Sequence, residues 1–253
     1  MTSDVLSFWN SRAPLSCKAG SNDLIAKSIE IEALANYFRD GLEVMEFGCG
    51  NGITALELAR RFQISIEAFD FSSAMIEAAV SSANSTDLSS KVNFSVGDIT
   101  DPPEIAGRFD IVFTERMVIN LSHWKAQLAA ISTLCGYLKP GGKLLLMENS
   151  ATGLKKINEM RSMVGLPEIS PPWHNLYLDD TKVSEVTIDD CDLVEVVPYS
   201  ATYYFLSRVV NAWLAHQEGR EPSYDAPVNR LAQLLPPIGD HAQGKLWVFE
   251  KRS

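Results

Sequence analysis

Short apolar runs alternate with longer amphipathic stretches through most of the chain, and this alternation constrains the fold more than any other feature. The runs are rich in β-branched and aromatic residues and are bounded by Gly, Pro or Asp, which is typical of strands buried on both faces. We predict strands in EVMEF, SIEAF, VNFSV, FDIVFT, KLLLME, LVEVV and KLWVFEK. Alternation of strands and helices predicts a parallel sheet with ligands bound at the carboxyl ends of its strands.

The stretches between these runs predict helices. A Ser/Asn/Asp cluster at residues 21–23 is typical of a helix start, and Gly41 is typical of a helix end. Further helices are predicted over residues 54–62, 72–83, 122–138, 153–164, 201–216 and 228–235. The Pro-rich segment PEISPPWHNLY, which follows the KLLLME run, is expected to be a loop.

Composition narrows the range of partners. The 253 residues include 22 Lys and Arg against 32 Asp and Glu, and a net charge of -10 disfavours a nucleic-acid partner. Cys17, Cys49, Cys135 and Cys191 form no C-x-x-C pair, so neither a metal site nor a disulfide framework is expected. The start of the chain lacks a signal-peptide pattern, and no apolar run is long enough to span a bilayer. We expect a cytoplasmic monomer or homodimer without a membrane partner.

The segment VMEFGCGNG, residues 44–52, joins the first strand to the next helix. Gly48 and Gly50 fit the dinucleotide fingerprint G-x-G-x-x-G, but Ile53 occupies its third glycine position. A pyrophosphate at this turn would also lie close to Glu46 without a compensating cation. S-adenosylmethionine has no phosphate and carries a sulfonium and an ammonium group, so Glu46 and the glycines favour it over a nicotinamide dinucleotide.

Two further carboxylates end the second and third predicted strands. Asp70 follows the second strand, where an acid can accept hydrogen bonds from ribose hydroxyls. Asp98 follows the third, where its carboxylate can take the adenine amino group while the amide of Ile99 faces a ring nitrogen. Each acid alone could be a helix N-cap. Acids after three consecutive strands, in this order, form a more specific pattern.

These segments together resemble the class I S-adenosylmethionine-dependent methyltransferase family. VMEFGCGNG is similar to its first motif, EAFDFS to its ribose-binding segment, VGDITD to its adenine motif, and FDIVFTE and LKPGGKLLLME to its fourth and fifth strands. The resemblance covers residues 44–148 and implies a Rossmann-like, doubly wound, seven-stranded sheet, mostly parallel with an antiparallel last strand. It implies S-adenosylmethionine as cofactor, bound by Glu46, Gly48, Cys49, Gly50, Asn51, Gly52, Asp70, Phe71, Ser72, Met75, Asp98, Ile99 and Thr114.

One departure from the family concerns its last two strands, which a short loop usually joins. Here about 45 residues with two predicted helices separate LVEVV from KLWVFEK, and we expect them to form part of a lid over the acceptor. The expected organisation is one domain with an N-terminal helical cap (1–42), a cofactor-binding core (43–150), acceptor-binding and lid segments (151–244) and a last strand (245–253).

The residues after the fourth strand, Thr114-Glu115-Arg116, stand where the resemblance places the activated methyl group. An N-methyltransferase of adenine or glutamine would be expected to show Asn/Asp-Pro-Pro-Tyr or Phe there, and this chain does not. Arg116 can clamp an anionic acceptor, or it can pair with Glu115 or Glu46 and hold the shape of the site. The sequence leaves both roles open.

Four histidines compete for the role of general base. His123 is expected to start a helix, His216 to end one, and His241 to lie in a surface turn, so His174 in the Pro-ordered loop is the preferred candidate. Catalytic roles are assigned to Glu115, Arg116 and His174, and acceptor contacts to Arg116, Trp173, His174, Tyr177, Tyr203 and Arg208.

The N-terminal segment FWNSRAPLSCKAGSND is too apolar to be a tail. Trp9 and Arg12 are expected to fold over the cofactor, with Arg12 meeting its carboxylate, although Trp9 could equally pack on the body of the domain. The resemblance implies methyl transfer to a small molecule, at the oxygen of an anionic acceptor in our preferred interpretation. The alternatives are N-methylation of a small amine and binding of the cofactor without turnover.

Overall fold

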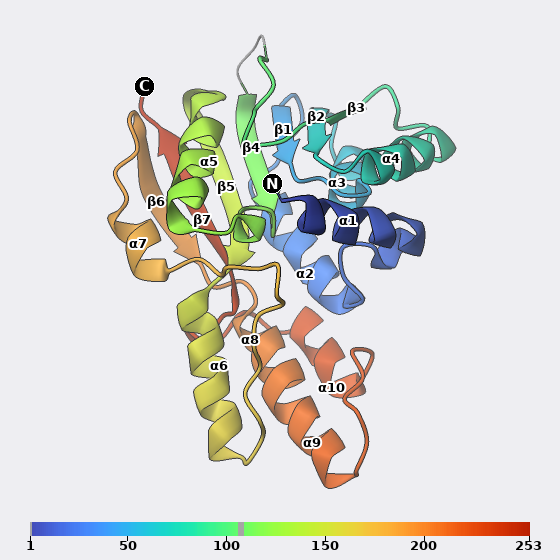
Figure 1. Ribbon diagram of the computed structural model, residues 1–253, viewed down its shortest axis with the longest axis vertical. Coiled ribbons are helices and arrows are strands. Elements are labelled where there is room, and N and C mark those ends of the chain that lie inside the picture. Colours follow the sequence, from blue (N-terminus) through green and yellow to red (C-terminus); the bar gives the residue numbers. More distant parts are fainter. Residues whose placement is uncertain (1, 106–108) are drawn as a thin grey trace.

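Seven strands form one mixed sheet in the order β3-β2-β1-β4-β5-β7-β6 (Figure 1). The computed structural model describes residues 2–105 and 109–253, apart from the side chains of Ser16 and Cys17. The strands are β1 (Glu43–Phe47), β2 (Ser65–Asp70), β3 (Val92–Val96), β4 (Phe109–Glu115), β5 (Leu138–Asn149), β6 (Cys191–Val197) and β7 (Gly244–Lys251). Strand β7 runs antiparallel to both β5 and β6, and the other neighbours are parallel. The predicted sheet is confirmed.

The chain reverses its direction across the sheet between β1 and β4. It runs from β1 outward to β3, then returns to β4 on the opposite side of β1. Phe47 at the end of β1 is in register with Phe69 of β2 and with Thr114 of β4, so three carboxyl ends lie side by side. Such a switch point is where ligands bind in open α/β sheets.

Helices cover both faces of the sheet. They are α1 (Ser3–Arg12), α2 (Leu24–Ala35), α3 (Ile53–Arg61), α4 (Ser73–Ser85), α5 (Trp124–Gly136), α6 (Ala151–Met163), α7 (Asp180–Glu185), α8 (Ala201–Tyr204), α9 (Asn211–Gln217) and α10 (Pro227–Arg230). In β5, Leu145 packs with residues of α2, α3 and α4, whereas Leu144 packs with residues of α5 and α7. Successive strand residues point to opposite faces, which explains why β5 is apolar throughout its centre.

The helix starts follow from side chains that accept hydrogen bonds from free backbone amides. The Asp23 carboxylate accepts from the Ala26 amide at 3.0 Å and begins α2, and Ser72 and Ser150 begin α4 and α6 in the same way. The His123 ring nitrogen Nδ1 accepts from the Ala126 amide at 3.1 Å, so the expected role of His123 as a helix start is confirmed.

Helices α6, α8, α9 and α10 form a small lobe beyond the carboxyl ends of the strands (Figure 1). Its core joins Ile157, Tyr203 and Val209 to Ile25 of α2. Short 3-10 turns occur at Ala13–Lys18, Val118–Asn120 and Leu231–Gln233. The single helix predicted over residues 201–216 is interrupted by a π-helical segment, Phe205–Val210. Arg161 of α6 donates to the carbonyl of Arg208 within the π-helical segment, a contact between elements that a sequence pattern does not reveal.

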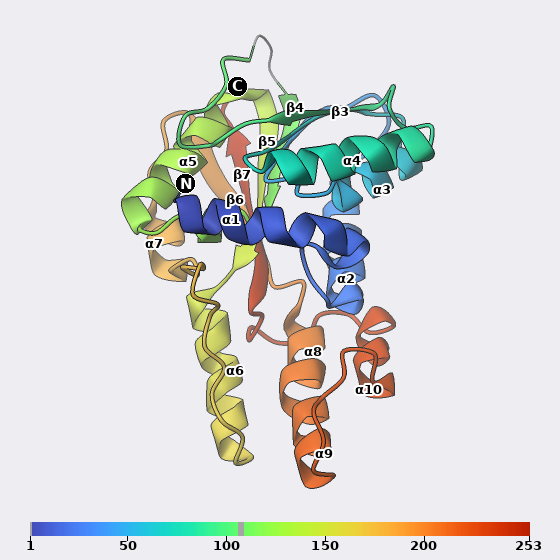
Figure 2. The same cartoon turned by 45° about the vertical axis from the view of Figure 1, so that its right-hand side comes forward.

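The N-terminal helix α1 crosses the sheet edge between α5 and α4 (Figure 2). Trp9 of α1 and Ala13 and Ala19 after it pack on Met75 of α4. Within the described residues, no helix is long and apolar enough to cross a membrane.

Candidate functional site

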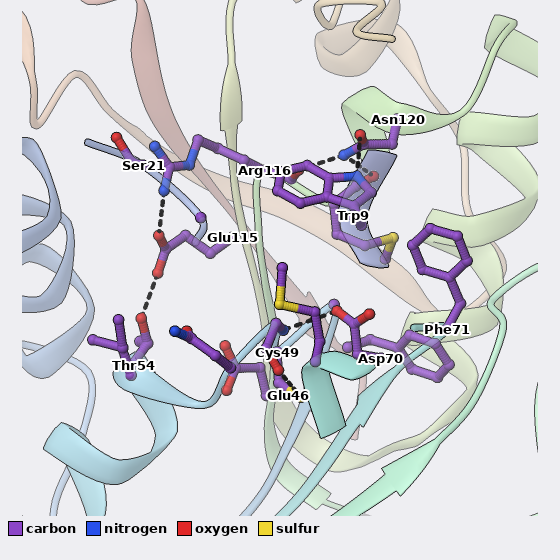
Figure 3. A pocket seen from close by; sticks show the side chains of 18 of the residues that line it. Trp9, Ser21, Glu46, Cys49, Thr54, Asp70, Phe71, Glu115, Arg116 and Asn120 are labelled. Carbon is purple, nitrogen blue, oxygen red and sulfur yellow. Dashed lines mark hydrogen bonds and ion pairs between the residues drawn. The ribbon is translucent and has the colours of Figure 1, made fainter. Parts of the chain in front are cut away.

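A pocket lies at the carboxyl ends of β1, β2 and β4, where α1 passes (Figure 3). Segments far apart in the sequence build its wall: α1, the segment before α2, the turn after β1, and the ends of β2, β3 and β4. The lining residues are Trp9, Gly20, Ser21, Lys27, Glu46, Phe47, Gly48, Cys49, Gly50, Asn51, Ile53, Thr54, Asp70, Phe71, Met75, Gly97, Ile99, Glu115, Arg116, Met117 and Asn120.

The turn after β1 is shaped by three left-handed glycines. A Cβ on Gly48 would stand 2.4 Å from Met117 Cγ, and one on Gly52 would stand 2.6 Å from the Phe94 ring, so both glycines make room for core side chains. A Cβ on Gly50 would meet nothing within 4 Å. The amide of Gly50 donates to Asp70 Oδ2 at 2.8 Å, which ties the turn to the end of β2.

Glu46 is buried at the end of β1, with 1% of its surface exposed, and its Oε2 atom has no hydrogen-bond partner in the described part of the protein. Burial, reinforced by the negative charge of Glu115, raises the pKa of Glu46 to about 8, while Lys27 opposes the shift. A buried carboxyl of this kind favours the approach of a cation, because a cation would stabilise its ionised form.

Asp70 is also buried, but it is well hydrogen-bonded. Its two oxygens accept from the amides of Gly50, at 2.8 Å, and Ser72, at 2.9 Å. Burial raises its pKa to about 6, and the two amide bonds limit the shift. A carboxylate has about four acceptor positions, so Asp70 retains capacity for hydroxyl groups of a ligand.

The end of β3 contributes backbone and apolar surface to the pocket. Gly97 and Ile99 line it together with Phe71 and Met75, whereas Asp98 does not. One Asp98 oxygen accepts from the Thr100 amide at 2.9 Å and from the Thr100 hydroxyl at 2.8 Å. The structure therefore places Asp98 in a local turn beside the pocket, and its contact with the cofactor stays a prediction.

Four charged side chains meet at the far end of the pocket from Asp70. The buried Glu115 carboxylate accepts from Lys27, from Arg116 Nη2 at 3.1 Å and from the Thr54 hydroxyl at 2.7 Å (Figure 3). Burial alone would raise the pKa of Glu115, but Lys27 and Arg116 outweigh it and lower that pKa. Glu30 lies 3.5 Å from Arg116 and 3.9 Å from Lys27, and burial raises its pKa.

The backbone of Arg116 adopts a left-handed conformation with φ of 53°. This costs a non-glycine residue about 1–2 kcal/mol, and neighbouring contacts hold it. The Arg116 amide donates to the Met147 carbonyl at 2.8 Å, while Glu148 accepts from the amides of Met117 and Val118 at 3.1 and 3.0 Å. Strain of this kind concentrates at functional sites, and here it directs the Arg116 side chain toward the pocket.

Helix α1 is held over the pocket by polar and aromatic contacts. The Trp9 indole donates to Asn120 Oδ1 at 3.2 Å, and the Ser72 hydroxyl donates to Asn10 at 2.6 Å. The Phe8 ring lies 4.3 Å from the His174 ring, measured between centroids. Trp9 thus lines the pocket and also packs on the body of the domain at Met75, and its contact with a cofactor stays a prediction.

Arg12, which is expected to meet the carboxylate of the cofactor, is not among the residues that line the pocket. Its Nε and Nη2 atoms donate to the carbonyls of Ala19 and Lys18, because the 3-10 turn after α1 brings these carbonyls within 2.5 and 2.7 Å. Gly52 and Ser72 stand just behind the wall, at the starts of α3 and α4.

Thr114 also lies behind the pocket wall. It is fully buried, and its hydroxyl donates to Glu148 at 2.8 Å, so the side chain points between β4 and β5. Cys49, one of the residues expected to bind the cofactor, lines the pocket, and burial raises its pKa.

Five residues proposed for the acceptor lie outside this pocket. His174 packs against α1, and Trp173 is 67% exposed. Tyr203 and Arg208 both turn to Asp23, the cap of α2, and the Tyr177 hydroxyl accepts from Gln243 at 3.2 Å. Their sequence positions gave no hint of these partners, which come from α2 and from the segment before β7.

Sequence reasoning missed Lys27, Ser21, Thr54 and Asn120 in the pocket wall. Lys27 had a usable signal, because it lies four residues before the buried Ile31 and thus on the apolar face of α2. A cation on an apolar helix face needs a buried partner. Asn120 had no such signal. Among the described side chains, no group of three or more His, Cys, Asp or Glu could hold a metal ion.

The sheet order, the switch-point pocket and the strand-end carboxyls define a class, the Rossmann-like α/β proteins that bind an adenosine-type cofactor.

A family model described as a methyltransferase domain matches residues 44–142. Phosphoethanolamine N-methyltransferase 1 of Arabidopsis thaliana is 30% identical over 110 residues, which cover 44% of this chain and 21% of that protein. Magnesium-protoporphyrin O-methyltransferase of Rhodobacter capsulatus is 43% identical over 72 residues, which cover 28% of this chain and 30% of that protein.

A solved structure extends the likeness to nearly the whole chain. Magnesium protoporphyrin IX methyltransferase from Synechocystis PCC 6803, with bound SAH, superposes with a TM-score of 0.55 at 14% identity, covering 91% of this chain and 82% of that one. At that identity the likeness shows the fold alone. The part of the chain that the family model matches, residues 44–142, is a methyltransferase domain of the class I S-adenosylmethionine-dependent type. The chain spans less than a third of the length of the two curated relatives above.

Proposed function

We propose that this chain transfers the methyl group of S-adenosylmethionine to a small molecule. One observation carries the proposal: Glu46 and Asp70, both buried at strand ends, share one pocket with the glycine turn. These residues fit the cofactor, because Glu46 has a buried oxygen without a partner and Gly50 faces open space. When bound, S-adenosylmethionine supplies a methyl group activated on a sulfonium centre.

Each part of the pocket suits one part of this cofactor. Asp70 would accept from the ribose hydroxyls, and Glu46 would face the ammonium group. Phe71, Met75 and Ile99 would pack against the adenine, with the Ile99 amide available to a ring nitrogen. Asp98 is a less direct candidate than the sequence suggested, because Thr100 takes up one of its oxygens.

A small acceptor is proposed because the chain itself covers the site. Helix α1 lies across the pocket, and the Trp9–Asn120 hydrogen bond closes it on the side of β4. A polymer would need this helix to move away, whereas a small molecule can be enclosed. Enclosure also excludes water, which would otherwise compete for the methyl group.

Oxygen is the proposed methylated atom, and nitrogen is the alternative, since the curated relatives include both O- and N-methyltransferases. An anionic acceptor is proposed on the basis of Arg116. Its contacts with described residues engage Nη2, so the guanidinium fork retains donors for a carboxylate or phosphate.

The chain's contribution to the reaction would be positioning and removal of water rather than proton transfer by Glu115. Three donors hold the Glu115 carboxylate, so it serves to orient Arg116 and Lys27. His174 lies beyond the pocket wall, where we assign it the support of α1. Holding two reactants in line supplies a large part of the rate enhancement in such displacements.

Turnover with a panel of metabolites tests the proposal. Incubation with S-adenosylmethionine and a mixture of hydroxylated carboxylic acids, phosphorylated metabolites and small amines should give one or more products heavier by a methyl group in mass spectrometry. The Arg116→Lys variant should lose at least tenfold in kcat/KM for an anionic acceptor while keeping cofactor affinity. Cofactor binding without transfer to any class would favour the non-catalytic alternative, and transfer to amines alone would contradict O-methylation.

A further inference from the structure

We propose that Lys27 of α2 binds the carboxylate of the cofactor's amino-acid end. The inference rests on the proposed function, because it assigns a subsite within the same pocket. It replaces Arg12, whose guanidinium is turned to the carbonyls of Lys18 and Ala19.

A carboxylate that leaves water for an enclosed pocket needs a cation or several donors. Among the described residues that line the pocket, the cationic ones are Lys27 and Arg116. The Lys27 side chain is 16% exposed, so it is shielded from bulk water but not sealed off.

The charges around Lys27 leave a place for one more anion. Lys27 and Arg116 carry two positive charges, and Glu115 is ionised between them. Glu30 is buried 3.5 Å from Arg116 and 3.9 Å from Lys27, although its Oε2 atom makes no hydrogen bond to the described residues. Burial raises its pKa, which favours the neutral form. The cluster therefore holds an excess of positive charge that a bound carboxylate would balance.

The position of Glu46 decides between the two cations. Glu46 is the partner expected for the ammonium group, and in an amino acid the ammonium and the carboxylate are attached to the same carbon atom. Lys27 Nζ lies 3.3 Å from the Thr54 hydroxyl, beside the glycine turn that follows Glu46, and its charge lowers the pKa of Glu46 against the effect of burial. The ion pairs of Arg116 with described residues are made to Glu30 and Glu115. We therefore assign the carboxylate of the cofactor to Lys27, and Arg116 remains available to the acceptor.

The backbone around Lys27 is well anchored. The Asp23 cap fixes the first turn of α2, and Gly20 and Ser21 line the pocket just before it. Lys27 Nζ also lies 3.3 Å from the hydroxyl of Thr54, in the first turn of α3 after the glycine turn. A carboxylate bound here would thus meet a cation held between two helix starts.

Titration calorimetry with three ligands tests the assignment. S-adenosylmethionine carries the ammonium and the carboxylate, decarboxylated S-adenosylmethionine keeps only the amine, and methylthioadenosine lacks both. The Lys27→Met variant should bind S-adenosylmethionine about 10- to 100-fold more weakly than the unaltered chain, the range for a hydrogen bond to a charged group. Its affinity for the other two ligands should change less than threefold.

Two further variants keep the test decisive. Lys245→Met removes a lysine of similar burial, 12% exposed, from its ion pair with Asp180 outside the pocket, and it should leave all three affinities unchanged. Lys27→Arg keeps the charge and should recover part of the loss. Equal weakening of all three ligands in Lys27→Met would make Lys27 a structural residue and overturn the inference. If the unaltered chain binds none of the ligands, the proposed function fails instead.

Discussion

Three buried carboxyls in one pocket illustrate how environment sets the behaviour of a residue type. Glu46 has an oxygen without a partner and a raised pKa, Asp70 has two amide partners and a smaller shift, and Glu115 lies among cations and is shifted the other way. The same chemical group is thus suited to a cation, to hydroxyls and to a structural ion pair. Desolvation sets the direction of the pKa shift where no hydrogen-bond donor or cation opposes it.

Glu46 should make the free protein less stable as the pH rises. Its carboxyl ionises at about 8 in the folded chain and at its ordinary value of 4.5 in the unfolded chain. The folded state therefore holds the proton more tightly, and stability is lost between pH 4.5 and 8. Glu46→Gln removes this penalty. In urea unfolding without cofactor, the variant should gain roughly 1–3 kcal/mol over the unaltered chain between pH 5 and pH 8.

The same substitution should weaken cofactor binding, because the amide offers the ammonium no charge. Glu57→Gln is the matched control. Arg60 and Arg61 lower the pKa of this glutamate to about 2, so it is ionised in both the folded and the unfolded chain from pH 5 to pH 8, and the stability difference of this variant should not change with pH over that range. A stability difference between Glu46→Gln and the unaltered chain that is constant from pH 5 to pH 8 would mean that Glu46 ionises normally.

At the scale of elements, α1 is attached more weakly than the helices of the core. Val5 is its one buried residue among those described, and its other anchors are the Trp9–Asn120 and Ser72–Asn10 hydrogen bonds and the Phe8–His174 contact. Elements held by few buried apolar contacts open at low free-energy cost. This helix is therefore suited to open for cofactor exchange.

Loss of the Trp9 side chain should speed release of the cofactor product. Trp9→Ala removes both its pocket contact and its hydrogen bond to Asn120, so we expect S-adenosylhomocysteine to dissociate at least tenfold faster in stopped-flow measurements. Trp9→Phe keeps an aromatic ring without the donor and should show a smaller change. Trp213→Ala, on α9 and outside the pocket, is the control. Unchanged dissociation in Trp9→Ala would show that α1 does not retain the ligand.

At the scale of the whole molecule, the pocket joins parts of the chain that are distant in sequence. Trp9 and Lys27 reach it from two helices, and Glu46, Asp70 and Arg116 reach it from the ends of three strands. A ligand that contacts all of them binds the folded chain and not the unfolded one. Binding energy is then added to the stability of the entire domain.

A saturating cofactor should therefore raise the melting temperature. At a concentration 100-fold above Kd, S-adenosylhomocysteine adds about 2.7 kcal/mol, which corresponds to roughly 5–10 °C for a domain of this size. NAD at the same concentration should have no effect, because Glu46 opposes a pyrophosphate. Differential scanning fluorimetry measures both shifts. A comparable shift with NAD would contradict the cofactor assignment.

The sequence by itself determined the sheet, because strand patterns and helix caps are local. The β-branched runs, the caps at Asp23 and Ser72, and the glycines at positions 48 and 52 specify elements through contacts within a few residues or through backbone conformation. Glu46 and Asp70 were predictable for the pocket for the same reason. Each ends a strand, and parallel strands bring their carboxyl ends to one edge.

Only the tertiary structure decided which partner each side chain meets. Arg12, Thr114 and Tyr203 have the chemistry of ligand-binding residues, yet each finds a nearer partner elsewhere in the chain. Lys27 enters the pocket because α2 packs beside the glycine turn. Hydrogen bonds and ion pairs act over a few ångströms, so their partners depend on packing between elements, and spacing along the chain does not encode that packing directly.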